Sequence, residues 1–198
     1  VGAYTSRNIV QNDSGFVTLG ASYNQNSAYG QQLTFYFFDS LGNYKYRKDY
    51  SDTLWSYSHG GTGGLQETGD GNYIVSSSRR SINYLDSSYH IIRDIFILKF
   101  DNNFDSIWMK TYVPTWDSIW WHDPLWYSYS CGVDNDGNYI SIGSSNVLEN
   151  GDTLTYPVLF ILKTDTAGNL IWYKSYPYGI GSGYLIDFDY ENDYWIAG

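Results

Sequence analysis

The chain has 198 residues, of which 42% are hydrophobic and 20% aromatic, so it carries enough apolar surface to fold and is not a disordered sequence. Its net charge of −10 argues against binding to nucleic acid or to anionic membranes, because phosphate contacts require a basic surface. A single cysteine, Cys131, provides no disulfide framework, and no apolar run reaches the ~18 residues of a membrane-spanning helix.

The first predicted element is a β-hairpin that recurs four times along the chain. Its turn is acidic and is followed by an aromatic residue and a short apolar strand, as in DGNY at 70–73. Gly and Asn tolerate positive φ, so such turns join antiparallel strands. A small residue stands four positions after each aromatic residue. The aromatic residues are Phe16, Tyr73, Tyr139 and Tyr194, and the small ones are Gly20, Ser77, Gly143 and Gly198.

The next predicted element is an apolar strand that ends in Asp. Its second and third copies, FILKFD at 96–101 and FILKTD at 160–165, match at five of six positions, and TFYFFD at 34–39 is a looser first copy. The second copy is nearly continuous in apolar residues and does not alternate. This pattern predicts a strand that is covered on both faces.

A fourth strand closes each unit and ends in Tyr, as in YRKDY at 46–50, WMKTY at 108–112 and WYKSY at 172–176. The closing Tyr stands 11 positions after the Asp of the third strand in all three copies (39 to 50, 101 to 112, 165 to 176). The distance between successive first-hairpin aromatics varies, at 57, 66 and 55 positions. A fixed spacing inside a variable period indicates a rigid hairpin flanked by loops of different length.

Each unit is therefore predicted to form four short strands, and no segment has the apolar spacing and caps of a helix. Four-stranded units in series are typical of β-propellers. We predict an all-β fold, a β-propeller-type array of four-stranded antiparallel blades in one domain over 1–198. The blades are expected at about 4–50, 61–112 and 128–176, with two strands of a fourth at about 183–198. Propellers close with four to eight blades, so we expect an incomplete array whose parent protein is longer.

Three motifs of the third unit, DGNY at 136–139, FILK at 160–163 and GNLIWYKSY at 168–176, carry a resemblance. Their order resembles the propeller-like repeats of secreted Bacteroidota proteins, and the likeness covers almost the whole chain. The resemblance implies a secreted or cell-surface location and export by the type IX secretion system. The N-terminal VGAY lacks the basic and apolar regions of a signal peptide, as a mature secreted chain also would.

The first candidate site is a metal site formed by acidic residues or by histidines. DNDGN at 134–138 is similar to the start of a calcium loop, but Ser145 stands where a bidentate Glu is expected, and Gly is fourth instead of sixth. A polar hairpin turn, repeated in every unit, explains the segment better. His59, His90 and His122 lie in different segments without ligand spacing. No metal and no cofactor are predicted.

Glycoside hydrolysis is the enzymatic alternative for a secreted propeller, and it needs two carboxylates ~5–10 Å apart. Most of the 21 acidic residues lie in the repeated turns, and Glu67 and Glu149 are interpreted as solvated carboxylates outside the repeat. Cys131 has no evident His partner and is interpreted as a small buried residue. No catalytic residue is predicted. The leading hypothesis is a non-catalytic binding or structural module, and the alternative is part of a glycan-acting enzyme completed by further blades.

One tryptophan-rich connection stands outside the repeat pattern. Four tryptophans lie within eleven residues and could form a stacking platform for sugar rings, an anchor for a protein partner, or packing between blades. DPLW at 123–126 parallels DTLW at 52–55, which favours packing for the last of the four. For the other three both interpretations stay open, and our hypothesis is that at least two of them face a glycan or protein partner. The candidate binding residues are Trp116, Trp120, Trp121 and Trp126.

Overall fold

The computed structural model describes residues 9–23, 31–51, 56–57, 64–85, 88–112, 126–147, 153–176, 185–188 and 193–197. Within these ranges the chain forms β-strands and no helix, which confirms the all-β prediction. Accordingly, no helix in the described part of the chain is long and apolar enough to cross a membrane.

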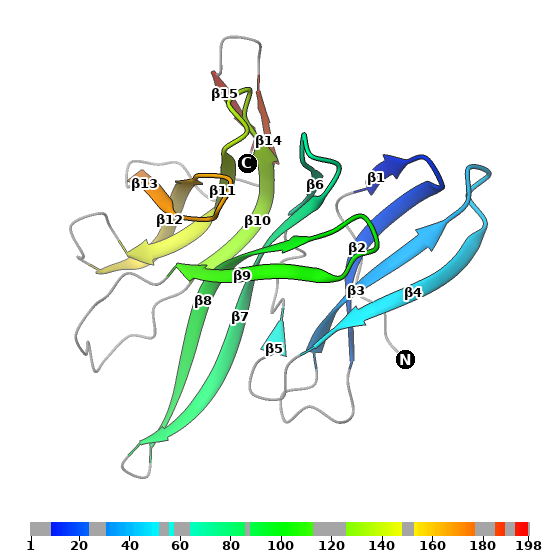
Figure 1. Ribbon diagram of the computed structural model, residues 1–198. Helices are drawn as coiled ribbons and strands as arrows, with labels where there is room; N and C mark the ends of the chain where they lie inside the picture. Colours follow the sequence, from blue (N-terminus) through cyan, green and yellow to red (C-terminus); the bar gives the residue numbers. More distant parts are fainter. Residues whose placement is uncertain are drawn as a thin grey trace.

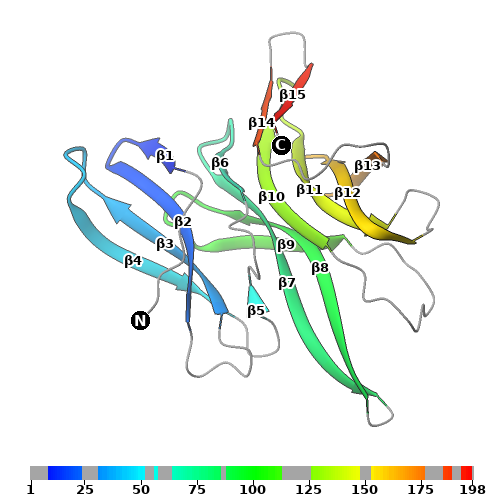
Figure 2. The same cartoon turned by 180° about the vertical axis from the view of Figure 1, so that it is seen from behind.

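The strands form separate antiparallel sheets in which each strand pairs with the next along the chain (Figures 1 and 2). The first sheet holds β1 (Ile9–Asn12), β2 (Gly15–Tyr23), β3 (Gln31–Phe38) and β4 (Tyr44–Tyr50). The third sheet holds β10 (Trp126–Val133), β11 (Tyr139–Val147), β12 (Thr153–Thr164) and β13 (Leu170–Tyr176). The strands β14 (Leu185–Phe188) and β15 (Tyr194–Ala197) form a hairpin.

The second sheet holds β6 (Gly64–Glu67), β7 (Tyr73–Leu85), β8 (Ser88–Phe100) and β9 (Ser106–Tyr112). The short β5 (Ser56–Tyr57) also pairs with β7, opposite Arg79 and Arg80. The strands β7 and β8 have 13 residues each, so they are longer than the hairpin pattern alone predicts. Their sequences beyond the blade are rich in Ile and Tyr, which favour strands, and Figure 1 shows this extension projecting from the sheet.

The small residues of the second strands occupy equivalent positions, as the repeat predicts. Gly20 pairs with Thr34, Ser77 with Phe96 and Gly143 with Phe160, and each partner lies five residues before the Asp that ends the third strand. A Cβ on Gly143 would lie 1.8 Å from the carbonyl oxygen of Tyr127 and 2.8 Å from the Phe160 ring. At Gly143 no Cβ fits, because the neighbouring strand β10 approaches closely.

The sheets pack face to face as blades of a propeller-type array. Three apolar clusters fill the contacts between neighbouring sheets. They lie between the first and second sheets, between the second and third, and between the third sheet and the β14–β15 hairpin. Within the second sheet Val75 and Leu98 enter the first cluster, whereas Ile74 and Ile97 enter the second. Within the blade, both faces of β7 and β8 are therefore buried at 73–76 and 95–98, which confirms the prediction from the continuous apolar strand. The described sheets do not close into a ring.

Lysines of the fourth strands link successive blades. Lys48 Nζ lies 2.6 Å from an Asp105 carboxylate oxygen, and Lys110 Nζ lies 2.8 Å from Oδ1 of Asn169. The two lysines stand nine positions after the Asp of their own third strand, and each reaches the last residue of the corresponding turn in the next blade. Exposed contacts of this kind contribute about 0–1 kcal/mol each, so they add little to the stability of the array.

Five turns share one hydrogen-bond pattern. The backbone N–H of the first residue donates to the carbonyl of the fifth, and the N–H of the fourth donates to the carbonyl of the first. The fourth residue has positive φ in every case, which explains why it is Gly in four of the five turns. The exception is Phe104, with φ of 59°. The turns span 39–43, 68–72, 101–105, 134–138 and 165–169.

Candidate functional site

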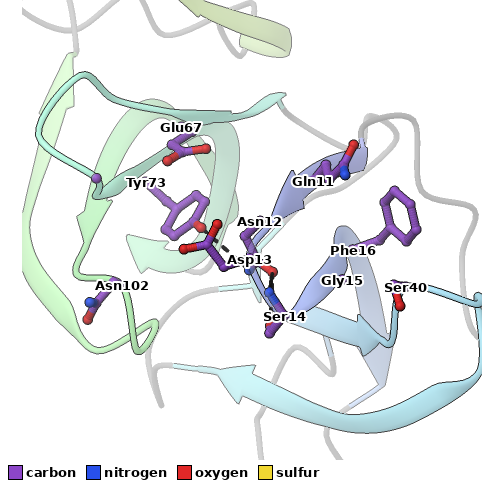
Figure 3. Close-up of a pocket in the computed structure, with 11 residues that line it drawn as sticks. Gln11, Asn12, Asp13, Ser14, Gly15, Phe16, Ser40, Glu67, Tyr73 and Asn102 are labelled. Carbon is purple, nitrogen blue, oxygen red and sulfur yellow. Dashed lines mark hydrogen bonds between the residues drawn. The ribbon is translucent and has the colours of Figure 1, made fainter.

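A polar pocket of about 860 Å³ lies between the turns of the first and second blades. It collects residues from the β1–β2 and β3–β4 turns of one blade and from the corresponding turns of the next (Figure 3). Figure 3 shows Asp13, Glu67 and Tyr73 arranged around the same hollow, with Asn12 bonded to the Tyr73 hydroxyl. The lining residues are Gln11, Asn12, Asp13, Ser14, Gly15, Phe16, Ser40, Glu67, Gly71, Tyr73 and Asn102.

The charge of the pocket is negative. Asp13 and Glu67 are both solvent-exposed carboxylates, and the described lining residues include no Lys, Arg or His. The Tyr73 side chain is buried against Phe104, at 4.4 Å between ring centroids, and its hydroxyl faces the pocket rim near Asn12. Nδ2 of Asn12 donates to that hydroxyl at 3.5 Å, the long limit of a hydrogen bond. The pocket therefore offers acceptor oxygens beside an aromatic wall.

The corresponding place between the second and third blades is filled by a lysine of the protein itself. Lys99 Nζ lies 2.7 Å from a carboxylate oxygen of Asp70 and 3.0 Å from the hydroxyl of Tyr139. Burial acts to lower the pKa of Lys99, but the hydrogen bonds with Asp70 and Tyr139 outweigh it and the pKa is raised. Partial burial acts to raise the pKa of Asp70, and bonds from Lys99, Thr68 and Asn72 hold it below its ordinary value.

The first of these two places lacks the lysine that the second and third blades carry. The lysine position, two residues before the Asp that ends the third strand, is Lys99 in the second blade and Lys163 in the third, but Phe37 in the first. Phe37 stacks on Tyr46 at 4.3 Å and meets Phe104 edge-on at 5.0 Å, so it belongs to the apolar cluster. Sequence reasoning missed the pocket, although the lost lysine was a visible signal.

The Lys99 contact supports a stability prediction. Lys99→Met should lower the free energy of unfolding by about 1–3 kcal/mol, because the buried Tyr139 hydroxyl and Asp70 both lose a charged donor. Lys110→Met, at an exposed contact, is the matched control and should cost less than about 1 kcal/mol. Urea unfolding of both variants measures the difference.

The stability difference between the wild type and Lys99→Met should depend on pH. The pKa of Asp70 is lowered in the folded protein, so its contribution is present above its unfolded pKa and is lost as the pH falls towards the folded value. The stability difference between wild type and Lys99→Met should therefore narrow below about pH 4. A stability difference that stays constant down to pH 2 would contradict the ion pair between Lys99 and Asp70.

The segment at 134–138 is a hairpin turn whose acidic side chain is bound by protein donors. The Asp134 carboxylate accepts hydrogen bonds from the N–H groups of Asp136 and Asn138 and from the Asn138 side chain, and Lys163 Nζ lies 2.7 Å away. Burial acts to raise the pKa of Asp134, but Lys163 and Asn138 lower it. These contacts agree with the turn interpretation and use the oxygens that a calcium ion would need.

Cys131 is buried at the contact between the second and third blades, as the sequence interpretation expects. Burial raises the pKa of its thiol to about 12, so the reactive thiolate is scarce at neutral pH. Cys131 should therefore resist a thiol reagent such as DTNB in the folded protein and react with one equivalent in 8 M urea. Rapid reaction of the native chain would show that these blades separate in solution.

Two carboxylates in the described ranges are buried, and they belong to different sheets. Asp94 pairs with Arg79 at 3.2 Å in the second sheet, and Asp134 pairs with Lys163 in the third. Burial raises the pKa of Asp94, against the opposing effect of Arg79. A glycosidase requires two carboxylates facing one substrate, with one of them held protonated by burial. These two residues do not form such a pair.

The predicted tryptophan site falls mostly on the connection between the second and third sheets. Trp116, Trp120 and Trp121 lie outside the described residues. Trp126 begins β10, where its backbone pairs with Ser145, and its side chain is outside the described part. The tryptophan-rich surface stays a prediction. A Trp120→Ala, Trp121→Ala double variant tests it, because it should lose ligand binding while keeping its stability.

Glu67 is at the end of β6 and lines the pocket, and Glu149 lies outside the described residues. Within the described ranges, no group of three or more His, Cys, Asp and Glu side chains is placed to hold a metal ion. The site is thus a polar pocket between repeats. No protein-family model and no curated protein matches the chain.

Proposed function

We propose that the chain is a non-catalytic binding module of a secreted or cell-surface bacterial protein, and that the pocket between its first two blades is a ligand site. The supporting observation is the pocket itself, which joins two blades and exposes carboxylate, amide and hydroxyl groups beside aromatic side chains. Such a combination of an apolar wall and a few convergent polar groups is typical of ligand sites.

Binding is favoured over catalysis by the environment of the acidic groups. Asp13 and Glu67 share the pocket but are both exposed, whereas a glycosidase needs one buried, protonated carboxylic acid. The glycan-acting enzyme stays the second candidate because two carboxylates do line one pocket. A bound glycan that is cleaved over many turnovers, with cleavage lost in Glu67→Gln, would favour the enzyme over the binding module.

The location is proposed from the resemblance of the repeats to secreted Bacteroidota proteins, which also supports export by the type IX system. The natural full-length protein should be found outside the cells or on their surface. In a strain that lacks the type IX translocon it should accumulate in the periplasm. Full-length protein found in the cytoplasm of the normal strain would contradict the proposed location.

The binding function is tested on arrays of glycans and peptides. The wild-type chain should bind a subset of array members, and Glu67→Gln should weaken that binding. Asp136→Asn is the matched control, because Asp136 is an exposed turn carboxylate in the third blade and does not line the pocket. Array binding that is equally strong in all three proteins would move the ligand site elsewhere on the chain.

A further inference from the structure

We infer that the pocket between the first and second blades recognises a primary ammonium group, and this inference rests on the proposed function of that pocket. The carrying observation is the next blade interface, where the protein places an ammonium group of its own between equivalent residues. We call the site with Lys99, between the second and third blades, the filled version, and the pocket between the first and second blades the open version.

The filled version defines the recognition geometry. Lys99 Nζ is held by the Asp70 carboxylate and the Tyr139 hydroxyl, and it lies 5.7 Å from the centroid of the Tyr139 ring. Asp70 belongs to the first-hairpin turn of the second blade, and Tyr139 is the first-hairpin aromatic of the third. The ammonium group of Lys99 is thus contacted by a carboxylate of its own blade and by a tyrosine hydroxyl of the next.

The open version keeps a carboxylate and a tyrosine hydroxyl and lacks the lysine. Asp13 stands three residues before the first-hairpin aromatic of its blade, as Asp70 does in the second blade. Tyr73 is the first-hairpin aromatic of the second blade, as Tyr139 is of the third. Both Asp13 and Tyr73 line the pocket (Figure 3). Phe37 replaces the lysine and is packed in the apolar cluster, so it supplies no donor.

The hydrogen-bonding capacity of Tyr73 supports the same assignment. Its side chain is 4% exposed, and among the described residues its hydroxyl is met by Asn12 alone, at 3.5 Å. This hydroxyl faces the pocket, so it can accept a further hydrogen bond from a ligand there. An ammonium group has three donors, and the Tyr73 hydroxyl and the Asp13 and Glu67 carboxylates supply three acceptors around the hollow.

The charge and shape of the pocket favour an ammonium group over other ligand groups. Two carboxylates without a described lining cation repel anions and attract cations. A guanidinium group is a planar fork that suits paired acceptors in one plane, whereas an ammonium group is a compact point charge. The Lys99 site holds a point charge between acceptors from two blades, and the pocket is lined by the same residue types from two blades.

The test compares ligands that differ in one charge. Nα-acetyl-lysine methylamide and its Nε-acetylated form are titrated into the 15N-labelled chain and followed by NMR. Glucosamine and N-acetylglucosamine form a second pair, which asks whether an amino sugar also supplies the group. We expect at least one free amine to shift pocket resonances and its acetylated partner to bind about tenfold more weakly or not at all.

The variants assign the effect to the pocket. Asp13→Asn should weaken binding of the amine by about tenfold, and Asp136→Asn, its counterpart in the third blade, should leave it unchanged. Equal binding of free and acetylated ligands at the pocket would overturn the ammonium assignment while leaving the pocket as a ligand site. If no amine binds while binding of the array ligands is still weakened by Glu67→Gln, the ammonium assignment is likewise wrong and the pocket remains a ligand site. Insensitivity of all ligands to both pocket variants would overturn the proposed function as well.

Discussion

Gly64→Ala should destabilise the protein by about 3 kcal/mol or more, because the new methyl group has no space at the contact between the second and third blades. A Cβ on Gly64 would lie 2.1 Å from the backbone nitrogen of Cys131 and 2.7 Å from the carbonyl carbon of Ser130. Both atoms belong to the backbone of β10, so a change of rotamer cannot relieve the overlap. The β6 and β10 strands would have to move apart, which opens the cluster between the blades.

Gly69→Ala is the matched control for this prediction. Gly69 lies in the turn that follows β6, and a Cβ there would meet nothing within 4 Å. The control should change the free energy of unfolding by less than about 0.5 kcal/mol. Urea unfolding followed by tryptophan fluorescence compares the two variants. Equal midpoints would mean that the backbones of β6 and β10 do not pack as closely as the structure describes.

Phe104→Ala should cost about 3–5 kcal/mol, the range for removing a buried aromatic side chain. The Phe104 ring stacks on Tyr73 at 4.4 Å and meets Phe35 and Phe37 at 4.9 and 5.0 Å. It therefore joins side chains of the first and second blades. Since Phe104 and an alanine there share the left-handed backbone conformation, the loss measures packing between the blades and no change of backbone strain.

Phe104→Gly should be less harmful than Phe104→Ala by about 1 kcal/mol, because glycine adopts positive φ without the steric cost of a Cβ. This order is the reverse of that expected inside a strand. Gly42→Ala is the control, since Gly42 holds the same turn position in the first blade with φ of 82° and open space around it. It isolates the cost of the left-handed conformation. A Phe104→Ala variant as stable as the wild type would show that the ring contributes no packing energy.

The repeat made the blade architecture predictable, because spacing and residue size determine strand register. The 11-residue interval from Asp101 to Tyr112 spans one hairpin, and the small residue at Gly143 reports a close neighbouring strand. The length of β7 and β8 was not predicted, since the hairpin signal ends at the blade. The turn at Phe104 was also hidden, because its sequence lacks the Gly that its conformation favours.

The pocket could not be predicted from one unit alone. Its lining comes from two blades, and its opening depends on Phe37, whose packing against Tyr46 and Phe104 is a tertiary contact. The sequence directed attention to the tryptophans at 116–126, whose abundance is visible in composition. An exchange of Lys for Phe within the repeat is equally visible, but its meaning requires the neighbouring Asp and Tyr to be placed in space.

A crystal structure of the chain with bound Nα-acetyl-lysine methylamide would test the central claim most directly. We expect its Nζ atom within hydrogen-bond distance of the Asp13 carboxylate and the Tyr73 hydroxyl, in the manner of Lys99 beside Asp70 and Tyr139. A ligand seated in the pocket with its Nζ turned to solvent, or bound only outside the pocket, would contradict the claim.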